Sequence, residues 1–179
     1  RSRTTWRPQR PQPTTPTLGA DEGAVPGTAA TLAATPMPGA ALSRLRLPAD
    51  AAPRASIVMV LTRDASQARA ALRALAAAHD GTVPAETFLV LNAAEPDVRR
   101  LALEEASGAR VLVSEANLGT ACAWNEAVRR ARGDYVVLVH EDAEVQPGWL
   151  AALVSAVEAE PRAAAAGARL LNPGGSLQN

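Results

Sequence analysis

Short aliphatic runs alternate with Ala-, Leu- and Arg-rich stretches through most of this 179-residue chain. The runs have the length of buried strands, and the stretches between them have the composition of helices. Strands that alternate with helices form a mainly parallel sheet with helices on both faces, because each crossover helix returns the chain to the same end of the sheet. We therefore predict an α/β fold. The expected strands are residues 56–61, 87–91, 109–113 and 134–139, and the expected helices are residues 66–78, 97–106, 120–132 and 148–160.

The run 134–139 contains five consecutive apolar residues and no polar alternation. Such a run is typical of a strand that is covered on both faces, so we expect it inside the sheet. His140, Glu141 and Asp142 follow it immediately. In open α/β sheets, ligands bind in the crevice outside the carboxyl ends of the strands. The sequence therefore predicts a ligand site at this polar turn.

Polar residues also follow the other expected strands. Thr62 and Arg63 leave the first strand, Asn92 leaves the second, and the loop with Asn117 and Gly119 follows the third. Because the strands are expected to be parallel, these exits should converge at one edge of the sheet.

The ends of the chain differ in composition. Residues 1–53 contain nine of the 14 prolines and few large apolar residues, so we expect a disordered tail or linker before a domain at residues 54–179. Residues 163–171 would form a further strand or extend a helix.

Composition and missing motifs exclude several classes. The formal net charge is zero, which gives no footprint for nucleic acid. The first expected strand is not followed by the Gly-rich phosphate loops of dinucleotide-binding or P-loop proteins. One cysteine, Cys122, excludes an internal disulfide and fits a reducing compartment. No signal peptide and no apolar span of 18 residues is visible, so we expect a cytoplasmic location, including the cytoplasmic face of a membrane.

The segment NLGTACAWNEAVRRARGDYVVLVHEDAEVQPGWL, residues 117–150, resembles the family 2 glycosyltransferases of the GT-A fold. The matching features are Asn-x-Gly, a small-residue helix with an internal Asn, Gly-Asp-Tyr, an apolar strand, an acidic turn and Pro-Gly-Trp-Leu. The likeness runs from about residue 55 to 179. It implies transfer of a sugar from a nucleoside-diphosphate donor to a glycan, lipid or protein acceptor, with the diphosphate held through a divalent cation.

The resemblance implies that the cation lies at the acidic turn. In an extended strand exit, residues i and i+2 point to the same side, so His140 and Asp142 should lie together while Glu141 turns away toward the donor. Asp142 is the best ligand for Mg²⁺ or Mn²⁺. His140 stands where the family usually has Asp or Asn, and an imidazole suits Mn²⁺ better than Mg²⁺. The alternatives are that His140 bonds nearby backbone and that Asp142 only caps the turn.

The donor contacts carry over to residues at the strand exits. Asn92 stands where the family often has the Asp that contacts the base. Thr62 and Arg63 fall where the nucleotide-contacting loop of the family begins, and Arg63 could reach base or phosphate or simply be solvated. Asn117 and Gly119 would shape the loop into a helix start that favours phosphate. Asn125 is a poor helix former, so it needs a partner, either backbone of adjacent loops or ligand.

Two other functions remain open. A nucleotidyltransferase could share the sheet, although Thr62 to Ala65 lack its usual Gly- and Lys/Arg-rich loop. A catalytically degenerate binding domain would explain His140 and Asn92 at two donor-contacting positions. The resemblance places the acceptor-binding half and the general base after Asn179, so we expect little turnover from this chain by itself.

Overall fold

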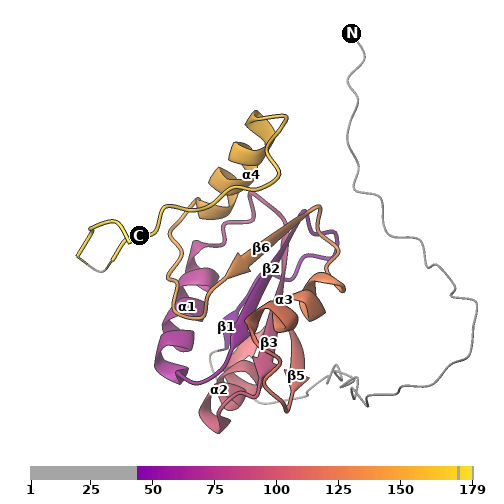
Figure 1. The fold of residues 1–179 in the computed structure, drawn as a ribbon, viewed down its shortest axis with the longest axis vertical. Coiled ribbons are helices and arrows are strands. Elements are labelled where there is room, and N and C mark those ends of the chain that lie inside the picture. Colours follow the sequence, from indigo (N-terminus) through magenta and orange to yellow (C-terminus); the bar gives the residue numbers. More distant parts are fainter. Residues whose placement is uncertain (1–43, 173, 179) are drawn as a thin grey trace, which may run out of the picture.

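The computed structural model describes residues 44–172 and 174–178, which form a parallel sheet with helices on both faces (Figure 1). The strand order is β5-β3-β2-β6, and every pairing is parallel. The predicted α/β architecture is confirmed. The four strands are β2 (Ala55–Leu61), β3 (Ala85–Asn92), β5 (Arg110–Ser114) and β6 (Tyr135–Val139), and a small second sheet pairs β1 (Leu45–Arg46) with β4 (Ala106–Ser107).

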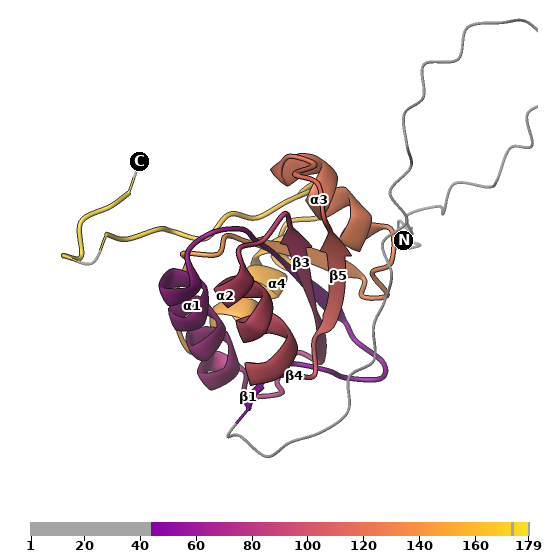
Figure 2. The same cartoon turned by 90° about the horizontal axis from the view of Figure 1, so that it is seen from below.

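The helices divide between the two faces of the sheet (Figure 2). One face carries α1 (Ala65–Ala78), α2 (Pro96–Arg100) with its π-helical continuation η1 (Leu101–Glu105), and α4 (Trp149–Ala159); α3 (Thr120–Val128) covers the other. No helix within the described residues is long and apolar enough to cross a membrane.

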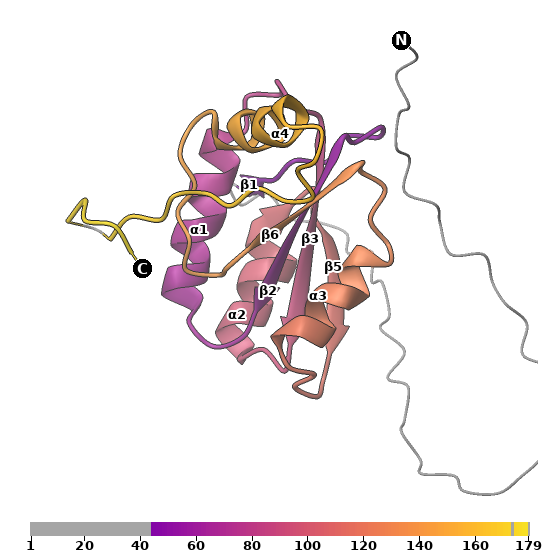
Figure 3. The same ribbon diagram turned by 45° about the horizontal axis from the view of Figure 1, so that its top comes forward.

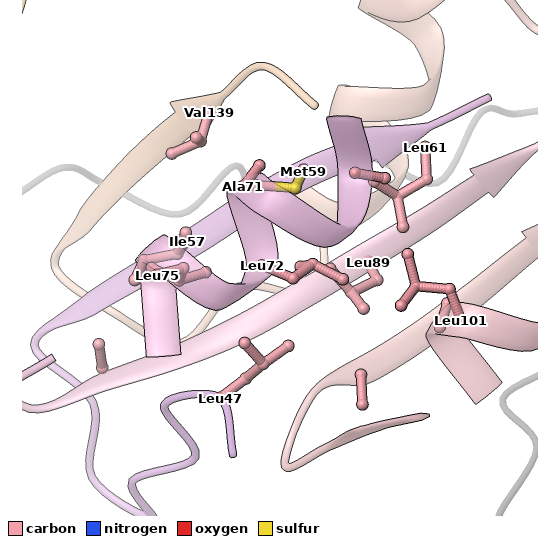
Figure 4. Packing of buried hydrophobic residues seen from close by; sticks show 14 of the residues in the cluster. Leu47, Ile57, Met59, Leu61, Ala71, Leu72, Leu75, Leu89, Leu101 and Val139 are labelled. Atoms are coloured by element: carbon pink, nitrogen blue, oxygen red, sulfur yellow. The ribbon is translucent and has the colours of Figure 1, made fainter. Parts of the chain in front are cut away.

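The larger core lies between the sheet and α1. Ile57, Met59 and Leu61 of β2 point at Leu72 and Leu75 of α1, and all five are essentially buried (Figure 4). The helix begins at Ala65, one residue before the expected start, because the Asp64 carboxylate accepts hydrogen bonds from the backbone of Ser66 at 2.9 Å and Gln67 at 3.0 Å. This cap fixes the direction in which the chain leaves β2.

The prediction that residues 134–139 are covered on both faces is wrong. β6 is the outermost strand of its sheet, and Val136 and Leu138 are 41% and 48% exposed. The buried side chains that pack with α3 come from β2, β3 and β5, so the α3 side of β6 stays open within the described residues. Its other face still packs on the core through Val139.

The domain begins before residue 54, so the expected boundary at that residue is too late. Leu47 is 5% exposed, its backbone N–H binds the Ser107 carbonyl at 2.9 Å, and the carbonyl of Pro48 accepts from the Thr87 hydroxyl at 3.0 Å. Composition concealed this, because residues 44–53 share the Pro- and Ala-rich character of the preceding chain. Residues 1–43 of the expected tail lie outside the described residues.

Three expected elements differ in extent. The helix expected at 97–106 changes to a π-helical turn at Leu101 and ends at Glu105. The helix expected at 120–132 ends at Val128. Residues 163–171 form no regular element, and the chain after α4 runs as an exposed extended segment away from the sheet (Figure 3).

Gly133 sits where the chain enters β6 against the start of β2. A Cβ at this position would lie 2.6 Å from the carbonyl carbon of Ala55 and 2.7 Å from the nitrogen of Ser56, which are both backbone atoms. Glu86 links the same two segments, because its carboxylate accepts hydrogen bonds from the side chain of Arg132 and from the Ser56 hydroxyl, each at 2.8 Å. Close approach of the two backbones therefore requires glycine here.

We expect Gly133→Ala to lower the free energy of unfolding by about 1–3 kcal/mol, because the new methyl group can be accommodated only by shifting backbone. Chemical denaturation measures this. Gly167→Ala is the matched control, since nothing lies within 4 Å of a Cβ there. Equal stability of the two variants would contradict the packing described for Gly133.

Candidate functional site

The polar turn after β6 brings His140 and Asp142 together. The turn is closed by a hydrogen bond from the Ala143 N–H to the His140 carbonyl at 3.1 Å, and Nδ1 of His140 lies 2.7 Å from Oδ1 of Asp142. Their side chains are 62% and 55% exposed. The predicted pairing is therefore present, but a tight turn produces it and not the extended exit that we expected. The hydrogen-bond partner of His140 is this carboxylate, not nearby backbone.

Glu141 faces away from this pair, as expected, and binds the exit of β2. Its Oε2 accepts from the Thr62 N–H at 2.7 Å, and its Oε1 accepts from the Thr62 hydroxyl at 2.5 Å. Both residues are half-buried. Direct donor contacts by Thr62 and Glu141 stay predictions, and the structure gives the two residues a second role as a link between strand exits.

Asn92 holds the loop that follows β5. Its Oδ1 accepts from the Leu118 N–H at 2.8 Å, and its Nδ2 donates to Oδ1 of Asn117 at 3.1 Å. Asn117 in turn accepts from the Gly119 N–H at 2.9 Å. Asn92 is only 2% exposed, so its amide is committed to shaping this loop. The role in base contact stays a prediction.

Gly119 is the N-cap of α3 and has φ of 75°, a conformation that favours glycine. Its carbonyl accepts the first helical hydrogen bond, from Ala123 at 3.1 Å. Asn125 is exposed, and its side-chain amide makes no hydrogen bond within the described residues. The alternative that Asn125 bonds the backbone of adjacent loops is wrong, because its side chain is exposed, and its contact with a donor stays a prediction.

Arg63 lines a shallow hollow between the exits of β2 and β3. The other lining residues are Asp64, Ala65, Glu95, Pro96 and Asp97. Hydrogen bonds from Ser66 and Gln67 lower the pKa of Asp64. The Asp64 carboxylate therefore already has partners, as the N-cap of α1. Asp97 lies in the first turn of α2 and pairs with Arg100 at 3.0 Å. Arg63 is exposed at the edge of this hollow and thus close to the Thr62–Glu141 link.

Two supports of the site were not predicted from the sequence. Ala93 has φ of +50°, the single non-glycine residue with positive φ in the described part of the chain, and its N–H binds the Ser114 carbonyl at 2.8 Å. Ser114 is buried, and its hydroxyl donates to the Ala116 carbonyl at 2.7 Å. Ser114 pairs in register with Asn92. The sequence signal for this role was a polar residue directly after the third expected strand.

His140 and Asp142 are the side chains that could hold a cation. No group of three or more His, Cys, Asp or Glu side chains with metal-binding geometry occurs within residues 44–172 and 174–178. Mg²⁺ and Mn²⁺ are commonly bound by one or two protein ligands together with substrate phosphates and water. A carboxylate oxygen and an imidazole nitrogen, both exposed at the rim of the sheet, fit that pattern.

Comparison with protein families agrees with this geometry. The family model for glycosyl transferase family 2 matches residues 56–179. The chain therefore belongs to the family 2 glycosyl transferases, and its parallel sheet between two helical layers is consistent with the GT-A nucleotide-diphospho-sugar transferase fold. A search of curated proteins gives no match.

We expect Asn92→Ala to lower the free energy of unfolding by about 1–3 kcal/mol, because the Leu118 N–H and the Asn117 side chain lose their buried partner. Thermal or chemical denaturation measures the change. Asn125→Ala deletes the same amide from an exposed position and should leave stability nearly unchanged. A larger loss in Asn125→Ala than in Asn92→Ala would show that the loop clamp has been assigned to the wrong residue.

Proposed function

We propose that this domain binds a nucleoside-diphosphate sugar and transfers the sugar to an acceptor, with Asp142 and His140 holding a Mn²⁺ or Mg²⁺ ion on the diphosphate. Family membership supports sugar transfer in general. The observation that carries the finer proposal is the position of Asp142, which is exposed beside His140 where the exit of β6 meets the exits of β2 and β3.

The chain's own residues would bind and orient the donor at this rim. Asp142 and His140 supply the oxygen and nitrogen ligands, and Gly119 opens a helix start whose free N–H groups favour a phosphate. Arg63 adds a positive charge beside the exits of β2 and β3. When bound, a divalent cation would neutralise the negative charge that develops on the leaving diphosphate. Asn92 and Asn117 hold the intervening loop in place.

A binding domain without transfer activity is the second candidate. It is favoured by the buried Asn92 amide, which is bonded to the protein where relatives often have an Asp for the base, and by a histidine at one of the two cation positions. We propose that the acceptor of the sugar is a glycan, a lipid or a protein. An exposed free thiol at Cys122 is compatible with the proposed cytoplasmic location.

We expect UDP, GDP or dTDP to bind more tightly in the presence of Mn²⁺ than in its absence, and we expect Asp142→Ala to abolish this gain. Isothermal titration calorimetry with each nucleotide measures it. Glu160→Ala removes an exposed carboxylate beyond the end of α4 and is the control for loss of charge.

Metal-promoted binding that survives Asp142→Ala would contradict the cation site. Binding that never depends on metal would favour the binding domain over the transferase.

A further inference from the structure

Glu141 lies between His140 and Asp142 in the turn, but its carboxylate bonds to Thr62 at the exit of β2, which indicates a separate role. We infer that Glu141, through Thr62, is a positioning residue that couples cation binding at the turn to nucleotide binding at the neighbouring strand exits. This inference deepens the proposed function and rests on it.

The link between Glu141 and Thr62 is local in space and distant in sequence. The two hydrogen bonds, at 2.7 Å and 2.5 Å, join residues 79 positions apart and use both oxygens of the carboxylate. Hydrogen bonds to a carboxylate are about twice as strong as neutral ones, and partial burial protects them from competition by water. The turn is thus held from its middle residue, with His140 on one side and Asp142 on the other.

Thr62 extends this connection to the next strand exit. Its carbonyl accepts a hydrogen bond from the Glu95 N–H at 2.8 Å, and Glu95 lines the same hollow as Arg63. A chain of hydrogen bonds therefore runs from the turn after β6, through the exit of β2, to the loop after β3. This chain connects the turn that carries the proposed cation ligands, His140 and Asp142, with the strand exits beside Arg63.

The side chains of His140 and Asp142 are exposed, so few contacts of their own fix their positions and the turn must be held by its backbone and by Glu141. His140 and Asp142 bond to each other, and their backbone is fixed by the short turn and by Glu141. Groups that orient metal ligands contribute about 10-fold to 100-fold to metal affinity. Glu141 acts on the two ligands through the backbone of the turn, since its own hydrogen bonds go to Thr62. By linkage, the factor by which the cation tightens nucleotide binding equals the factor by which the nucleotide tightens cation binding. Cation ligands that are no longer held in place for the joint complex should therefore lower this factor.

The test compares Glu141→Ala with Glu144→Ala. Glu144 lies in the same acidic segment and is exposed, and its side chain makes no hydrogen bond within the described residues, so its removal changes the local charge equally. UDP, GDP and dTDP are titrated into each variant of the 179-residue chain with and without Mn²⁺. The readout is the dissociation constant without Mn²⁺ divided by the dissociation constant with Mn²⁺. We expect this ratio to fall about 10-fold or more in Glu141→Ala and to stay at the wild-type value in Glu144→Ala.

Two Thr62 variants keep the test decisive if Glu141→Ala does not fold. Thr62→Ser retains the hydroxyl and should keep the wild-type ratio. Thr62→Val removes one of the two hydrogen bonds and should lower the ratio. A purely structural role would lower the melting temperature of Thr62→Val without changing the ratio.

The inference is overturned if Glu141→Ala and Thr62→Val keep the wild-type ratio, or if Glu144→Ala lowers the ratio as much as Glu141→Ala does. Either result leaves the proposed function standing, provided that the wild type shows metal-promoted binding. A wild-type ratio of one would instead overturn the proposed function together with the inference.

Discussion

In-register parallel pairing of β2 with its two neighbours is the constraint from which the site follows. Leu61 pairs with Leu91 of β3, and Met59 pairs with Val139 of β6. Parallel strands end at the same edge of the sheet, so their exits are brought together whatever the distance between them in sequence. The contact between Thr62 and Glu141 is a consequence of this register, and the contact between Asn92 and Asn117 follows in the same way from the parallel pairing of β3 with β5.

The rim of the sheet is organised by hydrogen bonds between the strand exits. Glu141, Asn92 and Ser114 have their polar atoms bound to the protein, so they shape the loops. His140 and Asp142 differ from them because their side chains are exposed and bonded mainly to each other. This division separates residues that build the site from residues that remain accessible to a ligand.

The sequence predicts the fold well, because alternating strands and helices leave few arrangements for a parallel sheet. It also predicts that the polar strand exits converge and that Glu141 faces away from its neighbours. It fails where tertiary position decides the outcome. An apolar run cannot reveal whether its strand is internal or outermost, as the exposed Val136 and Leu138 of β6 demonstrate. Nor can residue type distinguish an Asn that clamps a loop, such as Asn92, from one that faces solvent, such as Asn125.

The central claim is that the Asp142 carboxylate presents its oxygen to a cation at the rim of the sheet. Crystals grown with UDP and Mn²⁺, with diffraction recorded at the manganese absorption edge, would test it most directly. We predict an anomalous peak within about 2.0–2.6 Å of an Asp142 carboxylate oxygen, the range for hard cations. A manganese peak that lies on the nucleotide but outside this range from Asp142, with the His140–Asp142 contact unchanged, would contradict the account.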